Sequence, residues 1–83
     1  MAFNSGTPLI ENIRYGLWSG GKTLKQMADD LDTTVPSIRT VVAERFRRRG
    51  KVPPLHRKIT EYLLANCHGF REWAEAEGIV NDN

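Results

Sequence analysis

Cysteine is nearly absent from this 83-residue sequence, in which it occurs once, at position 67. A single thiol cannot form an internal disulfide, so we expect a reducing compartment and place the protein in the cytoplasm. No apolar run approaches the roughly 20 residues that span a bilayer, and the N-terminal MAFNSGTP lacks the pattern of a secretory signal. The short length leaves little room for a cofactor domain. We therefore expect no enzymatic activity, no cofactor and no membrane contact.

Acidic residues are scarce in the middle of the chain. Residues 35–58 contain eight Lys and Arg side chains against Glu44 alone, a surplus of seven, although the whole chain has a net charge of only +2. Residues 1–34 have a net charge of −1 and residues 59–83 one of −4. Charge concentrated in this way favours a polyanionic partner, while a solvated basic face gives the same pattern. We expect the basic stretch to lie on a rigid helix held out from the fold.

The alternation typical of strands is weak throughout, whereas apolar residues recur at helical spacing, so we predict an all-α fold. The first helix has a stripe of Ile10, Ile13, Leu17 and Trp18 and ends at two glycines. Thr23 and Gln26 have the spacing of a capping box at the start of the second helix. The apolar stripe of this second helix contains Leu24, Met27, Ala28 and Leu31.

A short polar turn leads into a third helix, predicted over residues 36–49. Pro36 suits a first helical turn, and Gly50 ends the helix. The turn begins at Asp32, a residue type that tolerates left-handed backbone geometry better than most. The apolar face of this helix consists of Ile38, Val41, Val42 and Phe46, which leaves a polar face opposite it.

The C-terminal part follows a Pro-rich connector and has one long apolar stripe. It forms either one helix or two helices broken at His68–Gly69, and the glycine favours a break. Its stripe either packs onto the first three helices or forms a dimer seam through Tyr62, Leu63, Phe70 and Trp73. A wing that begins at residues 51–54 is a further alternative, but only Val52 suggests a strand there.

The segment LKQMADDLDTTVPSIRTVVAERFRRRG resembles the helix-turn-helix of bacterial and phage DNA-binding proteins. With the preceding helix it is similar to a three-helix, homeodomain-like or Myb-like unit. The resemblance implies a three-helix core followed by one or two additional helices. We divide the chain into a flexible N-terminus (1–6), a DNA-binding core (7–50), a connector (51–55), a helical segment (56–78) and a tail (79–83).

The resemblance implies a small transcriptional regulator, such as a repressor, that binds duplex DNA on the nucleoid. The predicted DNA-contacting residues are Thr23, Thr34, Ser37, Arg39, Thr40, Ala43, Arg47, Arg48, Arg49 and Lys51. Those near the start of the recognition helix would meet bases, and the basic ones at its end would meet phosphates. Two alternatives stay open. One is a DNA-architecture factor for recombination or packaging, and the other is a module that docks on RNA polymerase or another protein.

Two further patterns are interpreted as coincidental or structural. Residues 16–23 match the phosphate-loop pattern G-x-x-x-x-G-K-T, but the preceding residues have helical rather than strand spacing. Cys67 and His68, with His56 upstream, lack the spacing of a four-ligand zinc site, so we expect no metal. We expect Cys67 to pack in the core.

Overall fold

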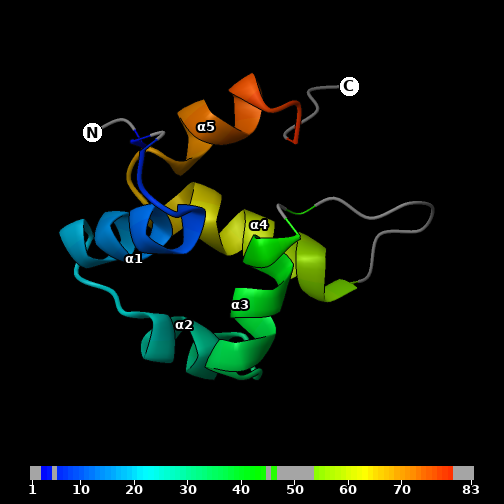
Figure 1. Ribbon diagram of the computed structural model, residues 1–83. Coiled ribbons are helices and arrows are strands. Elements are labelled where there is room, and N and C mark those ends of the chain that lie inside the picture. The colour runs from blue at the N-terminus through cyan, green and yellow to red at the C-terminus, as the bar shows by residue number, and fades with distance from the viewer. Residues whose placement is uncertain (1–2, 5, 45, 47–53, 80–83) are drawn as a thin grey trace.

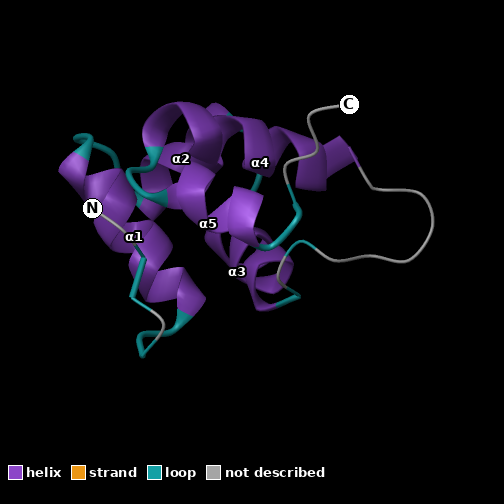
Figure 2. Ribbon diagram, turned by 90° about the horizontal axis from the view of Figure 1, so that it is seen from above, coloured by secondary structure: helices purple, strands orange, loops and turns teal. Residues whose placement is uncertain are grey.

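The protein is all-helical in the residues described by the computed structural model, which are 3–4, 6–44, 46 and 54–79. No strand occurs within these ranges (Figures 1 and 2). The five helices are α1 (Leu9–Ser19), α2 (Leu24–Asp30), α3 (Val35–Ala43), α4 (Pro54–Asn66) and α5 (Phe70–Ala76). In this part of the chain, no helix has the length and apolarity needed to span a bilayer.

One continuous apolar core joins all five helices. Figure 1 shows α2 and α3 at the lower end of the molecule, α1 and α4 across its middle, and α5 at the upper end. Helix α1 contacts both α3 and α4, while α2 packs on α3 and α5 on α4. The fully buried side chains with the largest volumes are Phe70, Ile13, Leu17, Met27, Ile38, Ile59 and Leu63. Helix α1 therefore connects the α2–α3 pair to the α4–α5 pair.

Helix α1 closely approaches the chain between α4 and α5 at Gly16, a buried residue of α1. Its carbonyl accepts a hydrogen bond from the His68 backbone N–H at 3.2 Å. A Cβ atom built on Gly16 would lie 2.5 Å from the His68 carbonyl oxygen and 2.6 Å from the Cys67 sulfur. Only glycine lets α1 lie this close to the chain between α4 and α5.

Cys67 lies in the same contact and is 7% exposed. Its thiol donates a hydrogen bond to the Ile13 carbonyl oxygen at 3.4 Å. Burial raises the pKa of the Cys67 thiol to about 12, because a thiolate is poorly solvated in the core. The expected packing role of Cys67 is confirmed.

The C-terminal segment consists of two helices, as the glycine at position 69 favours. Gly69 has a φ of 85° and lies directly before α5, a backbone geometry that glycine adopts without strain. The break turns α5 back so that Phe70 and Trp73 meet Phe46, with ring centroids 5.5 and 6.1 Å from it. An unbroken helix would have carried these two rings away from the core.

Three of the predicted segment boundaries are wrong. The N-terminus (1–6) is not wholly flexible, because the Phe3 ring packs on Phe70 and the Asn4 N–H bonds the Asn12 side chain at 3.1 Å. The connector (51–55) is shorter than expected, because α4 already begins at Pro54, where the missing N–H of proline has no cost. The tail begins later than 79, because Ile79 packs against the core.

The predicted apolar stripe of α1 is also wrong at one position. Ile13 and Leu17 are fully buried, but Trp18 is 68% exposed. At 100° per residue, Trp18 lies one step beyond Leu17 and thus on the outer side of the helix. The neighbouring Tyr15 is 57% exposed on the same side.

We predict that Gly16→Ala destabilises the fold. In most helices, alanine in place of glycine raises stability by roughly 0.5–1 kcal/mol, but here the new methyl group would overlap the His68 carbonyl. We expect the free energy of unfolding to fall by about 1–3 kcal/mol, measured by urea denaturation. Ser19→Ala, on the exposed side of α1, is the matched control and should change stability by less than about 0.5 kcal/mol. A more stable Gly16→Ala variant would contradict the close contact.

We also predict that the Cys67 thiol is unreactive in the folded protein. At pH 8, its reaction with an aromatic disulfide reagent should be at least about 100-fold slower than in the chain unfolded in guanidinium. Because folding raises this pKa from 9 to about 12, the neutral thiol contributes stability below pH 9, which is lost as the pH rises towards 12. Equal reaction rates in the two states would show that the thiol is accessible.

Candidate nucleic-acid interface

A tight turn holds α2 and α3 together. The Thr33 N–H donates to the Ala28 carbonyl oxygen at 2.9 Å, and the Asp32 N–H to that of Asp29 at 3.2 Å. Asp32 between them has a φ of 55°. This is the hydrogen-bond pattern of a Schellman motif, which most often has glycine at the left-handed position. The expected left-handed tolerance of Asp32 is thus confirmed.

Threonine side chains cap the N-termini of both helices. The Thr23 hydroxyl accepts a hydrogen bond from the Gln26 N–H at 3.1 Å, as the capping-box spacing predicts. The Thr34 hydroxyl accepts from the Ser37 N–H at 3.3 Å and donates to the Ser37 hydroxyl at 2.9 Å. Thr34 thus uses both its donor and its acceptor within its own helix. The Ser37 hydroxyl acts as an acceptor here and keeps its own proton for another partner.

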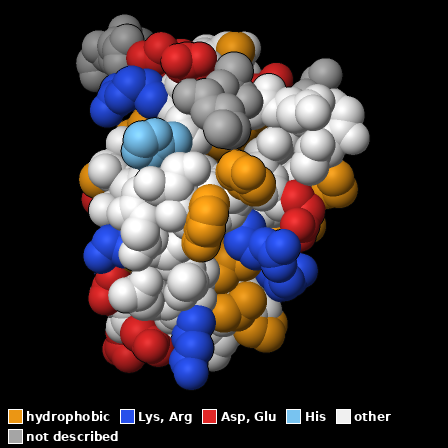
Figure 3. Space-filling model, turned by 90° about the vertical axis from the view of Figure 1, so that its left-hand side faces the viewer, with side chains coloured by type: hydrophobic (Ala, Val, Ile, Leu, Met, Phe, Trp, Pro, Cys, Tyr) orange, Lys and Arg blue, Asp and Glu red, His pale blue; other side chains and the backbone are white. Residues whose placement is uncertain are grey.

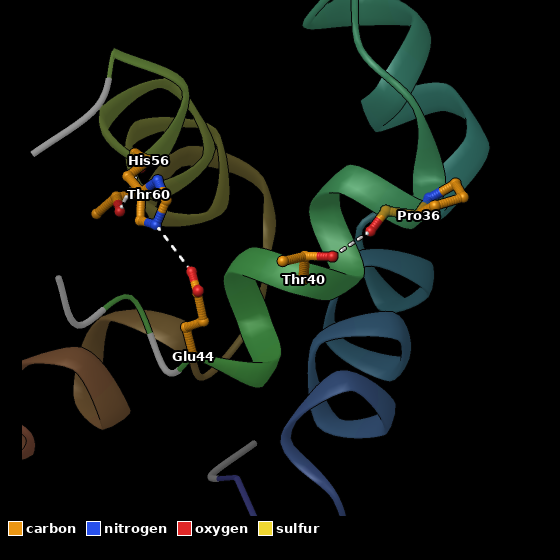
Figure 4. A network of polar contacts seen from close by, with 5 residues as sticks. All are labelled: Pro36, Thr40, Glu44, His56 and Thr60. Atoms are coloured by element: carbon orange, nitrogen blue, oxygen red, sulfur yellow. Dashed lines mark hydrogen bonds and ion pairs between the residues drawn. The ribbon is translucent and has the colours of Figure 1, made fainter.

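Helix α3 has a buried face and an exposed face. Ile38, Val41 and Val42 are buried, whereas three predicted base-contacting residues, Arg39, Thr40 and Ala43, are exposed. The Thr40 hydroxyl donates to the Pro36 carbonyl oxygen at 3.0 Å (Figure 4), so its lone pairs point away from the backbone bond. The structure brings these predicted residues together on one side of one helix.

The α3 helix is shorter than the predicted 36–49, because it ends at Ala43 and Glu44 forms its C-cap. The Phe46 N–H donates to the Val41 carbonyl oxygen at 3.1 Å, and Phe46 has a φ of 61°. This left-handed geometry costs a non-glycine residue of order 1–3 kcal/mol. Burial of the Phe46 ring against Phe70 and Trp73 offsets that cost. The left-handed backbone of Phe46 turns the chain out of the helix.

The sequence predicted that the basic residues of 35–58 lie along one rigid helix. This prediction is wrong, because the basic residues that the structure describes lie on two helices. Arg39 is an exposed residue of α3, while Arg57 and Lys58 are exposed in the first turns of α4. The predicted phosphate contacts Arg47, Arg48, Arg49 and Lys51 lie outside the described residues. They belong to the segment that connects the end of α3 to the start of α4.

A contact between Glu44 and His56 brings those two helix ends together. The Glu44 Oε1 and His56 Nε2 atoms are 3.5 Å apart, and both side chains face the gap between α3 and α4 (Figure 4). The His56 side chain is only 7% exposed, and neither of its ring nitrogens has a hydrogen-bond partner among the described residues. Sequence reasoning weighed His56 only as a possible metal ligand and missed this contact, although His56, Ile59 and Leu63 have helical spacing.

Arg39 lies beside a groove between α1 and α3. The groove has a volume of about 440 Å³ and is lined by Pro8, Leu9, Ile10, Arg39, Val42 and Ala43. Within the described part of the chain, no carboxylate lies within ion-pair distance of the Arg39 guanidinium. Its charge is therefore not neutralised by these residues and is available to an anionic or hydrogen-bonding ligand.

The residues predicted for a dimer seam face the core of their own chain. Leu63 and Phe70 are fully buried, and the Trp73 ring lies 6.2 Å from that of Phe3. The Tyr62 hydroxyl donates to Asp30 Oδ2 at 2.8 Å. Partial burial, together with this hydrogen bond and the charge of Asp30, raises the pKa of Tyr62 to about 12. These contacts match the packing alternative.

The structure also shows where the residues of the phosphate-loop pattern and the possible metal ligands lie. Gly16 lies inside α1 and not in a loop after a strand, so residues 16–23 do not have phosphate-loop geometry. Among the described residues, no three His, Cys, Asp or Glu side chains are grouped closely enough to hold a metal ion.

No protein-family model, curated protein or solved structure matches this chain.

We predict that Asp32→Gly stabilises the fold. Glycine adopts a φ near 55° without the steric cost that a side chain brings, so the free energy of unfolding should rise by about 0.5–1 kcal/mol, measured by thermal or urea denaturation. Asp29→Gly, within α2, is the matched control and should lower stability by about 1 kcal/mol or less. A loss of stability in Asp32→Gly would show that the Asp32 side chain itself stabilises the turn.

Proposed function

We propose that this protein binds duplex DNA through the exposed face of α3 and acts as a small, sequence-specific transcriptional regulator of the bacterial or phage helix-turn-helix type. The observation that carries the proposal is the capped α2–turn–α3 unit. It presents Arg39, Thr40 and Ala43 on one exposed face. The proposed site of action is the nucleoid.

The dimensions and chemistry of this face support the proposal. An α-helix with its side chains is about 10–12 Å across, close to the roughly 12 Å width of the major groove. Arginine at position 39 suits a bidentate contact with guanine, and the Thr40 lone pairs suit a cytosine amino group. The Ala43 methyl group suits the methyl group of thymine. The Ser37 and Thr23 hydroxyl protons are available to phosphate oxygens.

The charge distribution also supports binding of DNA at α3. Five of the basic residues, Arg45, Arg47, Arg48, Arg49 and Lys51, lie in the segment between Glu44 and Pro54. Glu44 and His56, which lie near the two ends of this segment, are 3.5 Å apart beside the C-terminal end of α3. On the same chain as α3, these charges would add phosphate contacts to those made by the helix.

We predict that Arg39→Ala weakens DNA binding and relaxes sequence preference. Loss of a guanidinium–base contact should lower affinity for the preferred site by about 1–3 kcal/mol, or roughly 5- to 150-fold, and affect random duplex less. Bound sites are first selected from random oligonucleotides. Affinity is then measured by fluorescence anisotropy over a salt titration, in which log affinity should fall linearly with log salt concentration.

Two matched arginine variants complete this test. Arg48→Ala should weaken all duplexes alike and reduce the salt slope by about one. Arg71→Ala, exposed on α5, should leave binding unchanged. If Arg39→Ala binds the selected site as tightly as the unmodified protein, this face of α3 does not read DNA. If no duplex is preferred over random sequence, a DNA-architecture factor replaces the regulator. If DNA is not bound at all, a protein-docking module becomes the better function.

A further inference from the structure

The groove between α1 and α3 has the size and lining of a small-molecule site. Its volume of about 440 Å³ falls within the roughly 300–1,000 Å³ of such sites. Val42 within it is buried, Leu9 and Ile10 in the first turn of α1 are half-buried, and Pro8 and Ala43 are exposed. Ligand pockets are mostly apolar, with a few polar groups that fix the orientation of the ligand. The lining of this groove follows the same rule.

The groove has one charged group. Among the described residues that line it, Arg39 is the only one with a polar side chain. Val42 and Ala43 follow Arg39 at three and four residues, so all three lie on one side of α3. No carboxylate of the described residues lies within ion-pair distance of the Arg39 guanidinium, whose N–H donors form a fork that matches a carboxylate group. The groove therefore combines an apolar surface with a positive charge that these residues do not neutralise.

We propose that this groove binds a small amphipathic monocarboxylate, such as a medium-chain fatty acid, and that this ligand competes with DNA. The carboxylate pairs with the Arg39 guanidinium, and the hydrocarbon chain covers apolar side chains of α1 and α3. Both parts contribute, because bidentate pairs of arginine and carboxylate are among the stronger hydrogen bonds and each CH₂ group adds buried apolar surface. For a ligand of about ten non-hydrogen atoms, we expect a dissociation constant of order 0.1–1 mM.

Other classes of ligand fit this lining less well. An acidic peptide carries backbone N–H and C=O groups that need hydrogen-bond partners, and among the described lining side chains only that of Arg39 supplies one. A free phosphate pairs with the guanidinium but has no apolar part to cover the rest of the lining. A neutral apolar molecule covers the lining but leaves the charge of Arg39 without a partner. A ligand with one carboxylate and a short apolar chain satisfies both.

The competition with DNA rests on the proposed function, in which Arg39 reads a base. One guanidinium fork cannot bind a carboxylate and a guanine base at the same time. The ligand therefore removes the Arg39 contact from DNA without a change of fold. At ten times its dissociation constant, a competing ligand lowers the apparent affinity for DNA about 11-fold. The groove thus gives the DNA-binding face a site for a small effector.

A nuclear magnetic resonance titration without DNA tests the binding site first. The probe is octanoate, and the matched compounds are octanamide, which lacks the charge, and acetate, which lacks the chain. The methyl signals of Leu9, Ile10 and Val42 should shift with octanoate and saturate with a dissociation constant of order 0.1–1 mM. Octanamide and acetate should each bind at least about 10-fold more weakly, because each loses one of the two contributions.

Two variants test the groove itself. Arg39→Gln should weaken octanoate binding at least about 10-fold, because it removes the charge and keeps a side chain of moderate length. Leu9→Glu should do the same by repulsion, and glutamate suits the first turn of a helix. Circular dichroism checks that both variants keep their helices.

Two further variants are controls for surfaces outside the groove. Hydrophobic side chains also reach the surface where α1 ends, beside charged ones of both signs (Figures 1 and 3). Trp18→Ala removes a side chain that is 68% exposed and does not line the groove. Arg71→Gln removes an exposed charge of α5. Both should bind octanoate as the unmodified protein does.

The binding proposal is overturned if octanamide binds as tightly as octanoate, if the shifted methyl groups lie outside the groove, or if Arg39→Gln binds octanoate unchanged. Competition is then measured by fluorescence anisotropy with the selected duplex. Octanoate at ten times its dissociation constant should lower DNA affinity about 11-fold, and octanamide at the same concentration should have little effect. An unchanged DNA affinity would overturn the competition. If octanoate binds but no duplex does, the groove site stands and the proposed function fails.

Discussion

The arrangement of the molecule depends on one backbone contact, that of Gly16 with His68. Helix α1 packs on α3 on one side and α4 on the other, and at Gly16 the two chain segments approach until no side-chain atom fits between them. The buried Cys67 thiol and the His68 N–H both hydrogen-bond carbonyl oxygens of α1 at this point. A small protein buries little apolar surface in total, so a dense junction between α1 and the α4–α5 pair contributes a large share of its rigidity.

That rigidity matters for the proposed interface because α3 reads no sequence unless it is held at a fixed angle. Its N-terminus is fixed by the Thr34 cap and the left-handed Asp32, and its C-terminus by the inward turn at Phe46. Its buried face rests on the core through Ile38, Val41 and Val42. Each end of the helix thus depends on a local backbone feature, while its orientation depends on the shared core.

Sequence patterns predicted the helix starts better than the helix ends. Starts depend on neighbouring residues, and the Thr23 cap was readable from its spacing to Gln26. The end of α3 depends on Phe46 meeting Phe70, a partner 24 residues further along, so the predicted helix ran to residue 49. The stripe containing Leu63 and Phe70 was equally compatible with a dimer seam and with internal packing. Only the turn at Gly69 decides between them. The exposed pair Tyr15 and Trp18 was missed because Trp18 was counted in the buried stripe of α1.

Glu44 and His56, which contact each other, flank the most strongly charged part of the sequence. The C-cap of α3 and the first turn of α4 lie 3.5 Å apart at this contact. Loop-closure entropy rises slowly with length, so residues can be added, lost or exchanged between these two points at small thermodynamic cost. Such an architecture lets evolution vary the net charge of a protein while its helices, and whatever they bind, stay as they are.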